Sequence, residues 1–388
     1  MDEKRGRDPH GGSSTRAIHA GARKPEAGAP VVPPVVQSAT FFWGRPEDGA
    51  LRYTRYGNNP NQELLARKLA ALEGTEAAVA VGSGMAAASM TLLSLTRSGD
   101  HIVAASRLYG ATRILLGEEL PRRGVETTFV DPDDAGAFAA ALRPETRLIY
   151  IEIPTNPALR VMDPAPVAAL CAERGIPLVC DATFAPPVNF RAAESGVDVV
   201  IHSATKYLGG HSDLIAGVVA GPSRVVEEVK RTVRMYGPVL DPHAAWLLDR
   251  GIRTLDVRME RHNRNALALA RWFRERPEVA RVLYPGLEDH PDHETARRLF
   301  SGFGGMLSIV LRGGGAAADA FMERLETALA APSLGGVETL VSQPRYTSHR
   351  GRTDEELAAQ GIADGFVRIS VGIEDVEDLI ADLANALD

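Results

Sequence analysis

Residues 148–183 read LIYIEIPTNPALRVMDPAPVAALCAERGIPLVCDAT, and this stretch decides the fold class. It begins with the apolar run Leu148–Ile153, continues through a helical pattern at Pro166–Arg174, and ends with a second apolar run at Leu178–Cys180. A strand, a helix and a strand in this order form the βαβ unit of a parallel sheet. The stretch therefore predicts an α/β protein.

The same alternation of short apolar runs and helical patterns extends in both directions from this stretch. Strands are expected at Ala77–Val81, His101–Ala105, Thr127–Val130 and Val197–Ile201, and a helix at Met85–Leu95. Alternation of this kind indicates a mostly parallel sheet that is flanked by helices on both faces.

The chain has 388 residues, which is long for one hydrophobic core and comfortable for two. We expect an N-terminal arm over residues 1–60, extended where Ala29–Ser38 is rich in proline, and a large domain over residues 61–243. A smaller α+β domain is expected over residues 244–388. Its helices are predicted at 244–248, 262–276 and 316–329, and its strands within 302–311 and at 366–370.

The composition excludes several classes of partner. The formal charge is −7, which argues against nucleic acid and anionic membranes. The uncharged run Ala77–Thr96 is interrupted by Gly82-Ser83-Gly84, so a strand, turn and buried helix fit it better than a membrane span. Residues 1–14 are polar and lack the apolar core of a secretory signal, and two cysteines cannot staple a chain of this size. We therefore expect a cytoplasmic protein.

Polar motifs follow three of the predicted strands, at the sheet edge where parallel α/β proteins bind ligands. Gly82-Ser83-Gly84-Met85 opens a helix and favours an anion, although most such turns are only turns. Asp181 follows one strand, and His202-Ser203-Ala204-Thr205-Lys206 follows the next. Pyridoxal phosphate (PLP) needs a lysine for its Schiff base and a carboxylate for its ring nitrogen. The alternative from spacing alone is an Asp–Lys ion pair.

Further motifs reveal a resemblance that covers nearly the whole chain. Several motifs follow one another in the order seen in one family: Tyr53–Gly57, Pro154–Pro157, His202–Tyr207 with Gly209–Asp213, Ser333–Gly336 and Arg368–Asp375. The chain resembles the PLP-dependent enzymes of cysteine and methionine metabolism, which include cystathionine γ-synthases, cystathionine and methionine γ-lyases and O-acylhomoserine sulfhydrylases. The resemblance implies fold-type I.

The resemblance also implies roles for residues around the cofactor. Lys206 would form the Schiff base and move protons, Asp181 would pair with the ring nitrogen, and Tyr109 would stack on the ring and act as an acid toward the leaving group. The remaining implied cofactor contacts, mostly to the phosphate, are Gly84, Met85, Thr183, Ser203 and Thr205, together with Tyr53 and Arg55 of a neighbouring subunit. Shared sites imply at least a homodimer, and family habit favours a tetramer.

The same resemblance assigns the substrate α-carboxylate to Arg368, with Asn156 and Ser333 as helpers. A guanidinium suits this task because it binds a carboxylate through two parallel hydrogen bonds. The alternatives are that Asn156 only caps a turn and that Ser333 only positions its loop. No metal is expected, and His290 and His293 are interpreted as structural.

The family divides into elimination and replacement at the γ-carbon of an amino acid. Ala111, Ile114 and Pro332 stand where enzymes of this family often have charged or thiol side chains, and this apolar set favours a thioether substrate. We therefore expect a methionine γ-lyase-like enzyme. The alternatives are a γ-replacement enzyme, in which Arg52 would meet a succinyl carboxylate, a cystathionine γ-lyase, and a non-catalytic binding protein that has kept this fold. Arg52, Ile114 and Pro332 weaken the cystathionine γ-lyase alternative, because the resemblance leads us to expect charged partners of a distal amino acid there. Ala111 stands where methionine γ-lyases often have a cysteine, which weakens the methionine assignment without abolishing it.

Overall fold

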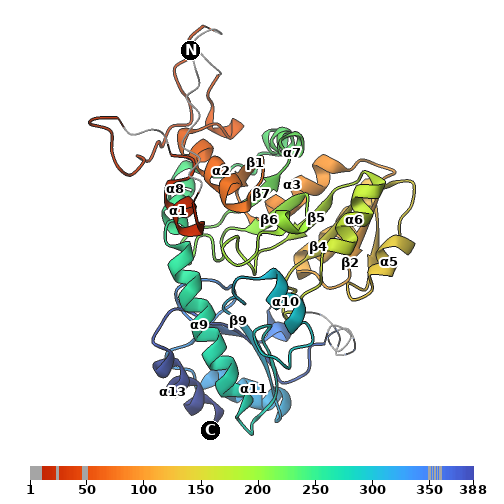
Figure 1. Ribbon diagram of the computed structural model, residues 1–388, viewed down its shortest axis with the longest axis vertical. Coiled ribbons are helices and arrows are strands. Elements are labelled where there is room, and N and C mark those ends of the chain that lie inside the picture. Colours follow the sequence, from red (N-terminus) through yellow and green to blue (C-terminus); the bar gives the residue numbers. More distant parts are fainter. Residues whose placement is uncertain are drawn as a thin grey trace.

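The computed structural model describes residues 11–22, 26–45, 51–347, 351, 353, 355, 357 and 361–388 (Figure 1). Most of the polar N-terminal segment expected over residues 1–14 lies outside the described residues. None of the described helices combines the length and the apolarity that a membrane crossing requires.

A seven-stranded sheet forms the upper layer of the molecule in Figure 1, in the order β1-β7-β6-β5-β4-β2-β3. Its strands are β1 Ala77–Val81, β2 His101–Ala105, β3 Glu126–Val130, β4 Thr146–Glu152, β5 Leu178–Asp181, β6 Val199–Ser203 and β7 Gly217–Gly221. All pairs are parallel except those that β7 makes with β1 and β6. The expected mostly parallel sheet is confirmed, and β7 is a strand that the sequence analysis did not identify.

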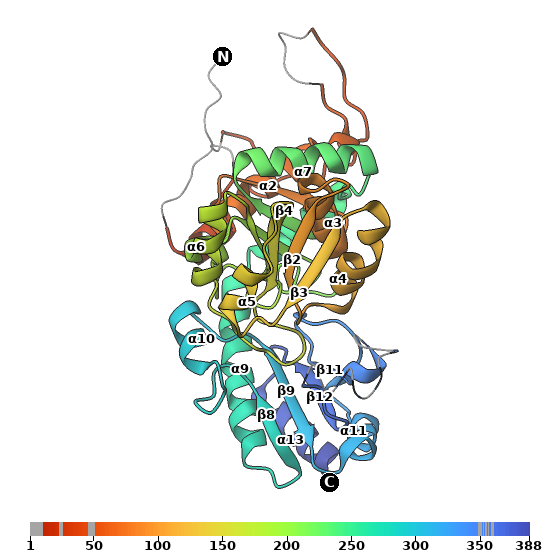
Figure 2. The same cartoon turned by 90° about the vertical axis from the view of Figure 1, so that its right-hand side faces the viewer.

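Helices cover both faces of this sheet because its strands are apolar on both sides (Figure 2). In β1, Val79 and Val81 face one core cluster with α3 and α7, whereas Ala78 and Ala80 face another with α2 and α8. The helices around the sheet are α2 Pro60–Glu73, α3 Gly84–Leu95, α4 Gly110–Ile114, α5 Ala135–Ala140, α6 Ala165–Arg174, α7 Ser223–Tyr236 and α8 Pro242–Ile252.

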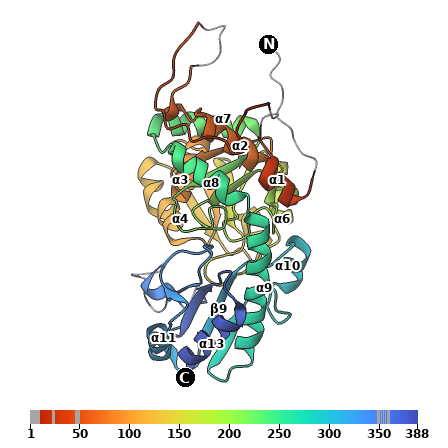
Figure 3. The same cartoon turned by 90° about the vertical axis from the view of Figure 1, so that its left-hand side faces the viewer.

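A second, five-stranded sheet lies at the other end of the molecule, in the order β10-β11-β12-β9-β8. Its strands are β8 Val279–Leu283, β9 Met306–Leu311, β10 Leu329–Ala330, β11 Leu340–Ser342 and β12 Phe366–Ser370, and its helices are α10 His293–Leu299, α11 Gly314–Glu323 and α13 Val376–Leu387. The long helix α9 Leu255–Arg274 runs along this sheet and reaches α1 Ser13–His19 beside the larger one (Figure 3). The residue limits of the two domains and the arm stay predictions.

Two expected elements of the second sheet differ from the observed ones for local reasons. The helix expected over 316–329 ends at Glu323, because both oxygens of the Asp382 carboxylate accept the N–H groups of residues 326–328 and draw the chain out of the helix. The strand expected within 302–311 begins only at Met306, because Gly304 has a φ of +82° in the left-handed region.

Candidate active site

The carboxyl ends of adjacent strands bring the predicted polar residues to one sheet edge. Asp181 ends β5 and Ser203 ends β6, and the two strands are neighbours in register, with Asp181 opposite Ile201. Apart from His202, which pairs with Glu73, the rest of both strands is apolar and buried, so Asp181 and Ser203 are the polar residues at the edge. Lys206 follows three residues after β6, in the turn that closes over this edge.

Lys206 points to the loop between β10 and β11 of the second sheet. Its Nζ donates a hydrogen bond of 2.7 Å to the hydroxyl of Ser333. Burial and, secondarily, the positive charge of Arg368 lower the pKa of Lys206 to about 8. The expected alternative, an ion pair with Asp181, is absent from the described contacts of either residue. The amine is therefore held by a hydroxyl group, and no carboxylate pairs with it among the described residues.

Arg368 lies in the middle of β12 and is only 5% exposed. Its guanidinium donates to the Asn156 side-chain oxygen at 3.0 Å and to the Ser333 carbonyl at 2.9 Å, while its Nε finds no hydrogen-bond partner among the described residues. A buried guanidinium N–H without an acceptor is costly. Arg368, Asn156 and Ser333 thus meet as expected, around a group that still lacks an anionic partner.

The glycine turn after β1 packs tightly against the end of β6. Ser83 caps α3 by accepting the N–H of Ala86 at 3.0 Å, and Gly84 is the first residue of the helix. A Cβ on Gly84 would lie 2.6 Å from the Cβ of Ser203, so only glycine fits there. The backbone N–H groups of the first turn of α3 therefore come next to the Ser203 hydroxyl, an arrangement that suits a phosphate.

Asp181 is a partly buried carboxylate with a defined set of partners. It accepts the N–H of Thr183 at 3.0 Å and the Thr183 hydroxyl at 2.5 Å, and the same hydroxyl accepts the N–H of Ser203 at 2.8 Å. Burial raises the pKa of Asp181, whereas the Thr183 hydrogen bonds and the nearby His202 oppose that shift. His202 in turn pairs with the buried Glu73 at 2.6 Å. Thr205 bonds only to the backbone of Ala216 among the described contacts.

Tyr109 lies at the start of α4, and its side chain is 42% exposed. Its backbone N–H donates to Glu152 Oε2 at 2.7 Å, and the N–H of Asn156 donates to Glu152 Oε1 at 3.0 Å. Glu152 was missed by the sequence analysis. The signal was a single acidic residue in the otherwise apolar run Leu148–Ile153.

Tyr53 and Arg55 lie apart from this cluster within the chain. They belong to the region of the short helix η2 Thr54–Tyr56, which packs against α7. Arg55 donates to the carbonyl of Arg234 at 2.7 Å, and its guanidinium lies 5.6 Å from the centre of the Tyr53 ring. The structure of one chain therefore does not bring these two residues to Lys206.

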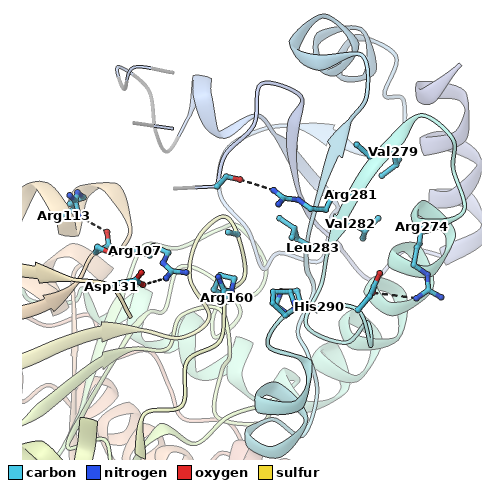
Figure 4. A pocket seen from close by; sticks show the side chains of 16 residues that line it. Arg107, Arg113, Asp131, Arg160, Arg274, Val279, Arg281, Val282, Leu283 and His290 are labelled. Atoms are coloured by element: carbon cyan, nitrogen blue, oxygen red, sulfur yellow. Dashed lines mark hydrogen bonds and ion pairs between the residues drawn. The ribbon is translucent and has the colours of Figure 1, made fainter. Parts of the chain in front are cut away.

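A separate cleft of about 840 Å³ lies between β8 and the loops after β2 and β4 (Figure 4). Guanidinium groups line it from both sides, but those of Arg107 and Arg160 are already paired with aspartates. His290 lies at its centre with Nδ1 accepting the N–H of Asp292, and burial lowers the pKa of His290 to about 4. The cleft does not include Lys206, Asp181 or Arg368.

The chain is similar to known proteins over nearly its whole length. The model of a family described as Cys/Met metabolism PLP-dependent enzyme matches residues 14–388. The L-methionine gamma-lyase of Pseudomonas putida is 42% identical over 387 residues, covering 97% of each chain. The chloroplastic cystathionine gamma-synthase 1 of Nicotiana tabacum is 39% identical over 384 residues, covering 96% of this chain and 71% of that one. The crystal structure of metB from Corynebacterium glutamicum aligns with a TM-score of 0.92 at 39% identity, covering 98% and 99% of the two chains.

Proposed function

The chain belongs to the Cys/Met metabolism family of PLP-dependent enzymes, whose fold-type I architecture it has, and within this family we propose that it is a methionine γ-lyase. The full-length similarity to enzymes named L-methionine gamma-lyase, at 41–42% identity, carries the proposal. Apolar residues next to the proposed site residues in the chain support it. Ala111 and Ile114 lie on one side of α4, three residues apart, and Pro332 adjoins Ser333. A methyl thioether needs no charged partner at its distal end.

The residues of the site fit the cofactor of the family. Lys206, whose pKa is lowered, supplies an amine for the aldehyde, and Asp181 supplies a carboxylate for the ring nitrogen. Gly84 lets the start of α3 lie directly against Ser203, which puts backbone N–H groups and a hydroxyl together for a phosphate. We propose that Met85, Thr183, Ser203 and Thr205 complete this cofactor site and that Tyr109 covers the ring.

Each proposed side chain has a separate task in the reaction. When bound, PLP supplies an electron sink for the charge that develops on the substrate α-carbon. Arg368 and Asn156 hold the substrate carboxylate, which gives the unpartnered Arg368 Nε an acceptor. Lys206 takes the α-proton as a neutral amine, and the Tyr109 hydroxyl gives a proton to the departing sulfur. Methionine and water are then converted to 2-oxobutyrate, ammonia and methanethiol.

A substrate panel with the purified, PLP-saturated protein tests the proposal. We expect 2-oxobutyrate and methanethiol from methionine alone. Product that forms only when cysteine or sulfide accompanies an O-acylhomoserine would overturn the assignment in favour of γ-replacement. A Lys206→Ala variant is the control, because it keeps the fold but lacks the reactive amine.

A γ-replacement enzyme is the second candidate, since the tobacco relative is named a cystathionine gamma-synthase. This reading gives Arg52 the task of binding a succinyl carboxylate. Arg52 is engaged with Glu63 at 3.1 Å, and both side chains are about one-third exposed. A succinylated substrate would have to compete with this carboxylate, which makes replacement on such a substrate the weaker proposal.

We also propose a homo-oligomer with shared active sites, a dimer at least and a tetramer by family habit. Exposed apolar side chains on the arm support this, with Val31 96% and Trp43 73% exposed. The distance of Tyr53 and Arg55 from their own site also supports it. Mixing inactive Lys206→Ala and Arg55→Ala variants should restore activity through mixed dimers, and no restoration after subunit exchange would refute shared sites.

The expected cytoplasmic location stays part of this proposal. It is supported by Cys171 and Cys180, which are buried free thiols. Fractionation of the native host with an antibody to the protein tests it.

A further inference from the structure

Glu152 is a buried acid whose partners are all backbone groups. It ends β4, is 6% exposed, and takes part in none of the ion pairs among the described residues. Each carboxylate oxygen accepts one N–H, from Tyr109 at 2.7 Å and from Asn156 at 3.0 Å. A buried carboxylate without a cation is costly unless hydrogen bonds satisfy it. The placement of this acid therefore needs an explanation beyond packing.

The two donors belong to the two sides of the active site. Tyr109 precedes α4 and is reached from β2, whereas Asn156 lies in the loop that follows β4. Asn156 extends the connection, because its side-chain oxygen accepts a hydrogen bond from Arg368 at 3.0 Å. The Glu152 carboxylate is therefore the direct link between the proposed aromatic cover of the cofactor and the proposed carboxylate clamp.

We propose that Glu152 is a positioning residue that fixes the backbone at Tyr109 relative to the backbone at Asn156. Through the Asn156 side chain, the same contact sets the guanidinium of Arg368. Glu152 touches neither the amine of Lys206 nor the Arg368 guanidinium itself among the described contacts. Glu152 therefore acts only by holding the two backbone segments at Tyr109 and Asn156 in place.

The neighbourhood of Glu152 makes a clean substitution possible. Glu152 lies opposite Asp181 in the sheet, and burial together with that neighbouring carboxylate raises the pKa of Glu152 to about 8. Glu152→Gln keeps the shape of the side chain, but its amide has only one oxygen. One of the two backbone N–H groups must then face an NH₂ donor.

Hydrogen–deuterium exchange on the full-length, PLP-loaded protein tests the inference. In Glu152→Gln we expect exchange to rise at least about tenfold at Tyr109 or Asn156, since each factor of ten corresponds to the loss of one modest hydrogen bond. In Glu152→Ala both positions should exchange faster. Peptides from β5 should exchange as in the wild type, which shows that the sheet is intact.

Kinetics provides a second measurement, with whichever amino acid the enzyme accepts. Because Asn156 and Arg368 bind the substrate carboxylate, KM should rise at least about tenfold in Glu152→Gln, since losing good geometry at a charge-assisted pair has effects of that order. The dissociation constant of PLP should change less than threefold, because the phosphate and ring-nitrogen contacts come from other strands.

The matched control is Glu126→Gln, which changes an acid on β3 that is exposed and paired with Arg143. It should leave exchange and KM unchanged. Unchanged exchange at both Tyr109 and Asn156 in Glu152→Gln would overturn the inference, as would a uniform rise across the whole sheet. The inference rests on the proposed site, but exchange is measured without turnover. A failure of the methionine assignment therefore leaves the exchange result standing.

Discussion

The pKa of the Lys206 side chain provides a direct test of the surroundings that the structure gives this amine. Its Nζ is buried, is held by the Ser333 hydroxyl at 2.7 Å, and lies in the field of Arg368. These surroundings disfavour the charged ammonium form, because burial removes water and a nearby cation repels it. We perturb this balance with Arg368→Met, which removes the cation and keeps an unbranched apolar side chain.

The magnitude follows from the pKa. Burial first and Arg368 second lower the pKa of Lys206 from 10.5 to about 8, so at pH 7 about one molecule in ten carries the free amine. At the ordinary pKa, only about one in three thousand would do so, so the site increases the free amine about 300-fold. Burial is the larger cause. Arg368→Met should therefore move the midpoint upward, but not back to its ordinary value.

Competitive labelling with acetic anhydride after removal of PLP measures this midpoint. The acetylated fraction of the Lys206 peptide is followed by mass spectrometry as a function of pH, with the Lys230 peptide of α7 as internal reference. We expect a midpoint near pH 8 in the wild type and a higher one in Arg368→Met. A wild-type midpoint at pH 10 or above, or a downward shift in the variant, would refute the reasoning.

Three further substitutions probe the remaining contacts. Asp181→Asn should leave PLP bound, as measured by the absorbance of the cofactor. Exchange of the substrate α-proton should slow by about tenfold or more, because a charge-assisted contact is lost. Rapid exchange of that proton would contradict the role of Asp181. Ser333→Ala removes the only described hydrogen bond of the Lys206 amine and should lower kcat/KM by less than about tenfold, the effect of one ordinary hydrogen bond. Gly84→Ala places a methyl group 2.6 Å from the Ser203 Cβ and should lower the stability of the fold by about 1–3 kcal/mol. We expect a lower melting temperature and weaker PLP binding. Unchanged melting temperature and PLP affinity would show that the turn can move to accommodate the methyl group.

Much of the large sheet was predictable because its strands are short, apolar and separated by helical patterns. The prediction for β2 matched the observed bounds, and those for β3, β4 and β5 agreed to within two residues. β7 was missed because its sequence, Gly217–Gly221, has glycine at both ends and reads as a turn. A Cβ on Gly217 would lie 2.0 Å from the Ser83 carbonyl oxygen. The glycine is there for close packing, which no local pattern reveals.

Candidate site residues could be predicted where the side chain itself is reactive or charged and stands in a recognisable motif. Lys206, Asp181 and Arg368 stand in motifs that identify the family, and the structure brings Arg368 to Ser333 and Asn156 as expected. Glu152 was not predicted because its role depends on two N–H groups, one of them 43 positions away in the chain. The contact between Arg368 and Ser333 likewise joins residues that lie 35 positions apart in the chain.

The distribution of the site over two sheets has an evolutionary consequence. Lys206 and Asp181 come from the seven-stranded sheet and its loops, whereas Arg368 lies on β12 of the five-stranded sheet and Ser333 lies in the loop between its strands β10 and β11. Genetic recombination near α8 between two such enzymes would keep the reactive amine of one parent and inherit the carboxylate-binding arginine of the other. In the proposed assignment, these two groups are therefore separately heritable.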